Sequence, residues 1–337
     1  TNTPTLINKR WFKILETTDY VLKYITDGKC NATSSYLSNS AYTYTPDTWS
    51  VVLDIKPFVS IPLYYPPSAQ FDEYVIKIKI SGDIFGDDHY PNTITSGELG
   101  TLHKYYRPYL GRVCHSIPFY VCLGNHEGEN DYYLSRNPPN NLAVWGTQWR
   151  QFYYPNPFPN SFYSGNTNSE HFGIGQPENY YAWNWGDALF VVLDVYRDQC
   201  DTSAKPQGWD WSLGAPQYNW LLNTLQNSQA KYKFVFAHHI RGQGRGGITN
   251  AKLFEWGGYE QNGRVYSFPT KRPNFPKPIH QMFRDYGVNI FFQGHDHVFA
   301  HEILDSVTYQ AVPMAADSTY MIGKLANADS YLSDTLE

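Results

Sequence analysis

The stretch IPFYVCLGNHE, residues 117–127, decides the fold of this chain. Its apolar part, residues 117–123, stops at Gly124 and is followed at once by Asn125, His126 and Glu127. A short apolar run that ends at a glycine is typical of a buried parallel strand in an α/β sheet. Open α/β sheets bind their ligands just beyond the carboxyl ends of their strands. We therefore expect the polar residues that follow this strand to lie at a binding site.

Three further segments have the same design. Each begins with a run that is typical of a buried strand, at residues 75–81, 232–236 and 288–293. Because parallel strands bring their carboxyl ends to one edge of a sheet, the polar clusters that follow are expected to converge on one crevice. Aspartate, asparagine and histidine together form an oxygen and nitrogen ligand set for divalent metals. The three clusters are Gly82-Asp83, Ala237-His238-His239 and Gly294-His295-Asp296-His297.

In this order the four segments resemble the calcineurin-like metallophosphoesterases, the superfamily that includes the purple acid phosphatases. The family pattern runs D-x-H, G-D, G-N-H-D/E, H and G-H-x-H, and the chain carries the last four parts. The resemblance implies an α/β fold, with a β-sandwich core flanked by helices. It also implies a metal-dependent hydrolase of phosphomonoesters or phosphodiesters. Two divalent or trivalent transition metals, zinc, manganese or iron, would form its dinuclear centre.

The resemblance also assigns metal ligands. Asp83 would bridge the two metals, and His297 would bind the first of them. The second metal would be held by Asn125, His238 and His295.

Further roles belong to neighbours of the ligands. The resemblance makes His126 a substrate contact or a general acid for the leaving oxygen. His239 would contact the phosphoryl group, although a surface position is an equal alternative. Glu127 would orient His126 from behind, and Asp296, between two ligands, is expected to face away from the metals.

The first family motif, D-x-H, is missing. No apolar strand precedes Ser68, and only nine residues, 73–81, separate this region from Gly82. Relatives often carry a tyrosine three residues after the bridging aspartate, where this chain has Gly86. These departures motivate an alternative: a non-enzymatic extracellular structural, adhesion or assembly protein that retains a degenerate form of the fold. Substitute ligands available nearby are Asp72, Asp87 and Gln70.

The glycine-rich segment 242–247 fits the pattern G-x-G-x-x-G. A dinucleotide site also needs a helix that opens at these glycines, and no amphipathic pattern begins there. We expect instead a loop that faces the substrate, with Arg241 and Arg245 as possible contacts to its anionic group. A plain solvent loop is an equal alternative.

Composition excludes some functions and favours a location. A net charge of −5 argues against a nucleic-acid surface, which would be basic. The sequence has no run of 18 apolar residues, so no membrane span is expected. Charged residues make up 17% and aromatic residues 17%, with 29 tyrosines, which is typical of secreted proteins. Asn31-Ala32-Thr33 fits the N-glycosylation acceptor pattern. The four cysteines could pair or remain free thiols.

The chain divides into three expected regions. Short strand-like runs predict a small all-β sandwich over residues 1–66, which resembles the fibronectin-type-III-like domain of purple acid phosphatases. Residues 67–320 form the expected metallophosphoesterase domain, and residues 321–337 a polar tail or linker. Within the second region we predict helices at 96–113, 215–228 and 278–286, and a hairpin that turns at Gly186-Asp187. Residues 137–176 are predicted to be a long ordered loop near the site.

Overall fold

A computed structural model describes the chain at residues 79–81, 87, 94–114, 118–130, 137–198, 207–240, 245–313 and 331. Four expected features lie outside these ranges: the sandwich over residues 1–66, the glycosylation site at Asn31, the metal bridge at Asp83 and the substrate contact at Arg241. The chain divides into two compact units, Thr1–Lys79 with Tyr106–Phe119, and Ile80–Tyr105 with Tyr120–Glu337. All the side-chain contacts described below lie within the second unit.

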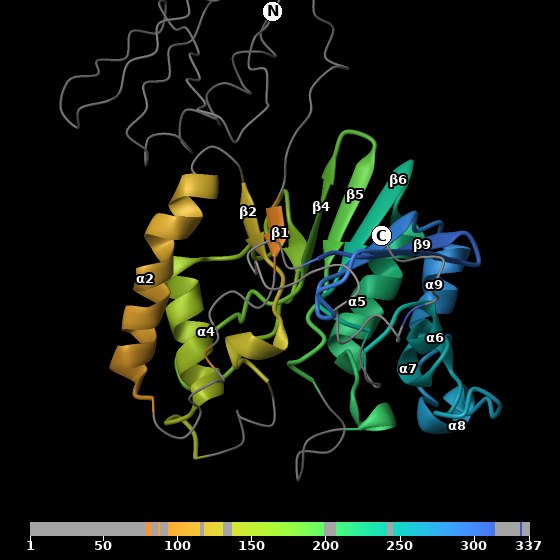
Figure 1. Cartoon of the computed structure of the whole chain (residues 1–337), viewed down its shortest axis with the longest axis horizontal. Helices are drawn as coiled ribbons and strands as arrows, with labels where there is room; N and C mark the ends of the chain where they lie inside the picture. Colours follow the sequence, from red (N-terminus) through yellow and green to blue (C-terminus); the bar gives the residue numbers. More distant parts are fainter. Residues whose placement is uncertain are drawn as a thin grey trace, which may run out of the picture. The chain divides into compact units, whose positions relative to one another are not determined.

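The main sheet is mixed (Figure 1). Its described strands lie in the order β3-β4-β5-β6-β7-β9-β8. The four strands β5, β6, β7 and β9 run parallel, and antiparallel pairs close both edges. Bounds are Ser164–Gly165 for β3, Tyr181–Trp185 for β4, Ala188–Val192 for β5, Tyr232–Phe236 for β6, Ile290–Gln293 for β7, Ala300–Leu304 for β8 and Val307–Ala311 for β9.

Helices cover one face of this sheet. Alternate side chains of the parallel strands, such as Val191, Val235 and Phe291, join a buried core with Leu221 of α5 and Phe283 of α9. These helices span Gly214–Asn227 and Ile279–Asp285, which confirms both predictions to within a residue at each end. Shorter helices follow between β6 and β7: α6 Ile248–Ala251, α7 Phe254–Gly257 and α8 Phe268–Lys271.

The other face meets a second layer through stacked aromatic rings. A two-stranded sheet there consists of β1, Lys79–Ser81, and β2, Phe119–Val121. Tyr120 of β2 stacks on Trp183 of β4 with ring centroids 4.4 Å apart, and Trp183 stacks on Phe190 of β5 at 5.0 Å. Tyr181 donates a hydrogen bond to the carbonyl of Val121 at 3.0 Å. The core is therefore a sandwich of two sheets, as expected.

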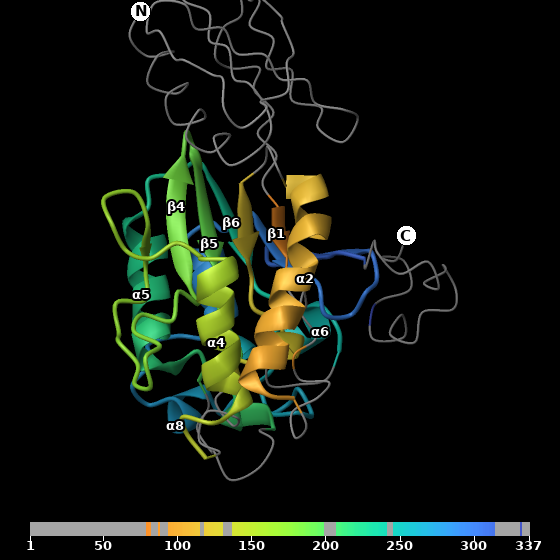
Figure 2. The ribbon, with the colours of Figure 1, turned by 90° about the vertical axis from the view of Figure 1, so that its left-hand side faces the viewer.

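Two helices belong to this second layer, and their parts within the second unit lie side by side (Figures 1 and 2). They are α2, Ser96–Cys114, and α4, Leu142–Tyr153. The start of α2 confirms the prediction, and Gly100 lets the helices approach because a Cβ there would lie 2.5 Å from the ring of Trp149.

The α4 helix was not predicted, since residues 137–176 were expected to be a loop. Asn141 caps the helix by accepting a hydrogen bond from the backbone N–H of Val144 at 3.0 Å. Leu142, Ala143 and Val144 are buried directly after the cap. Burial of this apolar first turn outweighs the many Pro, Asn and Gly residues around it.

The β4–β5 hairpin confirms the predicted turn, with Gly186 at φ 55°. None of the helices in the described ranges is both long and apolar enough to cross a lipid bilayer.

Candidate functional site

Three of the four polar clusters lie in the described residues, and each lies just beyond a strand. Asn125–Glu127 form a 3-10 turn, η4, shortly after β2. His238 and His239 follow β6, and residues 295–297 follow β7. Because β6 and β7 are parallel neighbours, their carboxyl ends lie together. The N–H groups of Gly294 and His295 donate to the carbonyl of His238 at 3.1 and 3.0 Å, so main-chain bonds join the two loops.

These two loops bring three imidazoles together. His238 Nε2 lies 3.1 Å from His295 Nδ1, and the rings of His239 and His295 have centroids 4.4 Å apart. His238 and His239 are both buried. In the described part of the chain, one group of potential ligands has all its donor atoms within 4.8 Å of one another: His239, His295 and Asp296.

The donor atoms fit a metal ion. Two nitrogens at about 2.1 Å from one metal would lie about 3 Å apart at an octahedral metal and about 3.4 Å apart at a tetrahedral one. The 3.1 Å separation of the His238 and His295 nitrogens, which is also a hydrogen-bond distance, falls between these two values. In addition, Asn125 Oδ1 is buried and finds no hydrogen-bond partner in the described residues. Buried side-chain oxygens are normally hydrogen-bonded, so this amide oxygen suits a cation.

The turn that carries Asn125 and His126 is shaped by a buried carboxylate. Glu127 is fully buried, and its Oε2 accepts a hydrogen bond from the backbone N–H of Gly124. The turn ends at Gly128 with φ 71°, where a Cβ would lie 2.7 Å from Leu142. Glycine at this position therefore lets the loop lie directly on α4. The carboxylate of Glu127 thus holds the backbone of the turn at its start. Asn125 and His126, on the same turn, are half-buried.

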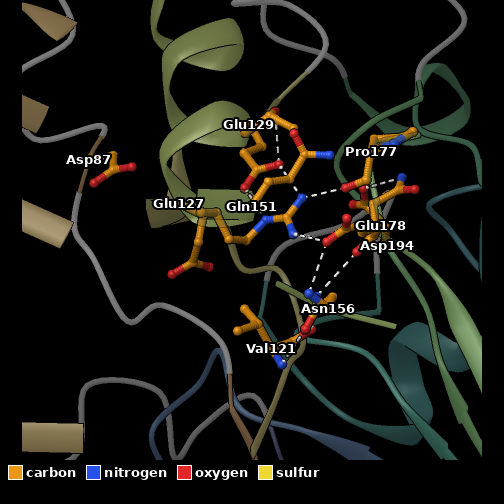
Figure 3. Close-up of polar contacts among 12 residues, drawn as sticks. Asp87, Val121, Glu127, Glu129, Gln151, Asn156, Pro177, Glu178 and Asp194 are labelled. Atoms are coloured by element: carbon orange, nitrogen blue, oxygen red, sulfur yellow. Dashed lines mark hydrogen bonds and ion pairs between the residues drawn. The ribbon is translucent and has the colours of Figure 1, made fainter. Parts of the chain in front are cut away.

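A buried ion pair holds Glu129, which follows Gly128 in the same loop. Arg150 of α4 is fully buried and donates to both carboxylate oxygens of Glu129, at 2.6 and 3.1 Å. The same guanidinium donates to the carbonyl of Pro177 and lies 4.0 Å from the carboxylate of Glu178. Figure 3 labels Glu129, Pro177 and Glu178. Thr147 adds a hydrogen bond to Glu129 at 2.9 Å. The loop after β2 is thus attached to α4 by charge.

Sequence reasoning missed the turn at residues 194–197, which follows β5. Arg197 donates to the carbonyl of Glu129 at 3.1 Å, while the ring of Tyr196 lies 6.0 Å from that of His238. One turn therefore contacts both the loop after β2 and the loop after β6. Arg197 also forms a two-fold ion pair with Glu170. The missed signal was an aspartate, Asp194, two residues beyond a buried strand, the same pattern as in the other clusters.

Asp194 organises this turn. It is buried, and its Oδ1 accepts hydrogen bonds from the backbone N–H groups of Tyr196 and Arg197 at 2.8 and 3.2 Å. Its Oδ2 accepts a bond from Asn179 at 2.7 Å. Burial raises the pKa of Asp194 to about 6, while these hydrogen bonds oppose the shift. The carboxylate is mostly ionised at neutral pH and fixes Tyr196 and Arg197 in place.

Asp87, a possible substitute ligand for the first metal, lies in a buried pair. Its Oδ2 is 2.8 Å from His103 Nε2, and both side chains are fully buried. A Cβ at Gly146 would lie 3.4 Å from the same oxygen, so the pair packs against the start of α4. Burial lowers the pKa of His103 to about 4. Asp87 thus has an imidazole partner within the protein.

The remaining predicted residues surround the imidazoles. Arg245 donates to the carbonyl of His295 at 2.8 Å, and its side chain is 39% exposed. Asp296 differs in part from the expectation that it faces away: its Oδ2 accepts from Gly246 and Tyr331, yet the carboxylate stays within 4.8 Å of His239 and His295. His297 adopts the left-handed conformation, with φ 60°.

A scan against protein-family models found no match, and a search of curated proteins found none. Among solved structures, the chain is similar to PhoD at 16% identity, over 66% of this chain and 45% of that one, with a TM-score of 0.44. It is also similar to the purple acid phosphatase PPD1 from yellow lupin (Lupinus luteus) seeds at 14% identity, over 73% and 39%, with a TM-score of 0.40. The chain spans less than half the length of either. These likenesses assign no ligand and no reaction, so the residues of the site carry the interpretation.

Proposed function

We propose that this chain is a metal-dependent phosphoester hydrolase of the metallophosphoesterase type. The observation that carries the proposal is the pair His238 and His295, whose ring nitrogens lie 3.1 Å apart at the ends of adjacent parallel strands. Asn125, with its buried amide oxygen, is the third ligand of the same metal. A dinuclear centre, with Asp83 as the bridge and His297 on the other metal, completes the proposal. Zinc, manganese and iron all suit such nitrogen and oxygen donors.

A bound metal would neutralise the phosphate oxygens and lower the pKa of a nearby water. The chain's own residues supply position and protons. His239, buried beside His295, would donate a hydrogen bond to a phosphate oxygen. His126, half-buried on the η4 turn, would give its proton to the leaving oxygen. Glu127 and the 194–197 turn would hold these groups in place.

The test joins metal content to turnover. Protein purified without chelator is analysed by elemental mass spectrometry and assayed with p-nitrophenyl phosphate and bis-p-nitrophenyl phosphate. We expect two transition metals per chain and hydrolysis of at least one substrate. His295→Ala should lose metal and reduce kcat/KM by at least a thousandfold, as expected when a ligand is removed from a catalytic metal (about 4 kcal/mol).

The matched control is His301→Ala, because His301 is exposed on β8. Its metal content and kcat/KM should equal those of the unaltered protein. Absence of bound metal together with absence of turnover in the unaltered protein would contradict the proposal. Full activity of His295→Ala would contradict it as well.

A further inference from the structure

Tyr331 is buried beside the loop that carries His295 and His297. Its side chain is 8% exposed, although it lies within the stretch expected to form a polar tail. The ring belongs to a small hydrophobic cluster with Val298, Ala300 and Ala311. Val298 directly follows His297, so the ring packs against the end of this loop.

The hydroxyl of Tyr331 joins the start of the loop to its centre. It donates to Asp296 Oδ2 at 2.6 Å and accepts a hydrogen bond from Gln293 Nε2 at 2.8 Å. Gln293 is the last residue of β7, and Asp296 lies between the two histidines. Gly246 completes the network, because its N–H donates to Asp296 at 2.8 Å and its carbonyl accepts from Gln293 at 3.2 Å.

Close packing shows that the position of this ring is specific. A Cβ at Gly247 would lie 2.9 Å from the ring of Tyr331 and 1.7 Å from Glu302 Oε2. Glycine at this position therefore makes room for the tyrosine. On the other side of Asp296, His297 adopts a left-handed backbone conformation, which residues other than glycine keep only when their surroundings enforce it.

We propose that Tyr331 is a positioning residue that holds residues 294–297 in the conformation that binds metal. The inference rests on the proposed function, because it assumes that His295 and His297 are ligands. Tyr331 contacts neither histidine through its hydroxyl. It acts through Asp296 and Gln293, which fix the loop at its centre and at its start. Groups that orient metal ligands typically change metal affinity by about 10–100-fold when they are removed.

The test is Tyr331→Phe in the full chain, which removes the hydroxyl and keeps the ring. The control is Tyr218→Phe, because Tyr218 is another buried tyrosine, and its hydroxyl donates to the backbone carbonyl of Lys277. Three quantities are compared: the affinity for Mn²⁺ alone by isothermal titration calorimetry, the amide hydrogen exchange of residues 294–298, and kcat and KM for p-nitrophenyl phosphate.

We expect Tyr331→Phe to weaken Mn²⁺ binding by about 10–100-fold and to speed amide exchange at residues 294–298. With Mn²⁺ in excess, the kcat of the variant should equal that of the unaltered protein. Tyr218→Phe should change none of these. Unchanged exchange at residues 294–298 in Tyr331→Phe would overturn the inference, whether or not metal binds. If the unaltered protein binds no Mn²⁺ or other transition metal, the proposed function fails, and the exchange measurement still decides whether Tyr331 orders the loop. Asp296→Asn, which weakens the same contact from its other side, should show the same local increase in exchange.

Discussion

The two halves of the site are built in different ways. The loops that carry His238 and His295 continue two parallel strands of the main sheet, and main-chain hydrogen bonds join them. The loop that carries Asn125 follows a strand of the smaller sheet and is held by the buried carboxylates of Glu127 and Glu129. The histidine half thus depends on sheet geometry, whereas the asparagine half depends on buried charge. Variants that break the buried Glu129–Arg150 ion pair should therefore damage the asparagine half more than the histidine half.

The largest effect is expected from Arg150→Met, which leaves the Glu129 carboxylate buried without its cation. Loss of one partner of a buried ion pair typically costs about 3–5 kcal/mol. We expect this loss in the free energy of unfolding, measured by urea denaturation, with the fastest hydrogen exchange at residues 124–130. The double variant Arg150→Met with Glu129→Gln should regain part of the stability. Equal exchange in both halves would remove the distinction between them.

Acid should also destabilise the second layer, because His103 lies on its helix α2. Burial lowers the pKa of His103 from 6.5 to about 4, so the unfolded chain takes up a proton at this residue at higher pH than the folded protein does. The contribution of His103 to the free energy of unfolding is therefore fully present above pH 6.5. It falls by roughly 3 kcal/mol as the pH drops from 6.5 to 4. Urea denaturation at several pH values measures the slope, and His103→Gln should flatten it. An identical slope in that variant would show that other groups cause the loss.

Arg197→Gln tests the turn that contacts both halves. The variant loses the bond to the Glu129 carbonyl and the ion pair with Glu170, but Tyr196 can stay on His238. We expect kcat/KM to fall by about 10–100-fold. The Mn²⁺ affinity of the histidine pair should change less. A parallel loss of metal affinity would mean that the turn supports both halves equally.

The smallest effect is expected from Arg245→Met. The guanidinium supplies one hydrogen bond to the His295 carbonyl and is partly exposed. Loss of such a bond costs about 1 kcal/mol, so kcat/KM should fall about fivefold. A much larger rise in KM would show that Arg245 also binds the substrate, as its position in the sequence suggests.

Local sequence patterns predicted the histidine half. The apolar runs of β6 and β7, followed by Ala237-His238-His239 and Gly294-His295, predicted both the strands and the place where their loops meet. The predicted helices α5 and α9 and the β4–β5 hairpin follow from the same kind of local signal. Each of these features depends on residues that are close together in the sequence.

For the asparagine half, the sequence predicted the motif at residues 124–127 but not the side-chain contacts that hold its loop. The contact between Glu129 and Arg150 spans 21 residues, and that between Glu129 and Arg197 spans 68. Side-chain pairing over such distances leaves no periodic pattern in the sequence. The α4 helix was missed for a related reason, since tertiary burial of Leu142 outweighs the loop-like composition around it.

The stacked rings between the layers have an optical consequence. Tyr120 and Trp183 belong to different sheets, and their rings lie nearly parallel, with centroids 4.4 Å apart and planes inclined by 22°. Two aromatic chromophores at this distance couple electronically and give rise to circular dichroism in the near ultraviolet. Separation of the layers would remove the contribution of this pair to the near-ultraviolet signal even while the backbone of the main sheet stayed intact. The protein thus contains its own spectroscopic reporter of the junction between its two sheets.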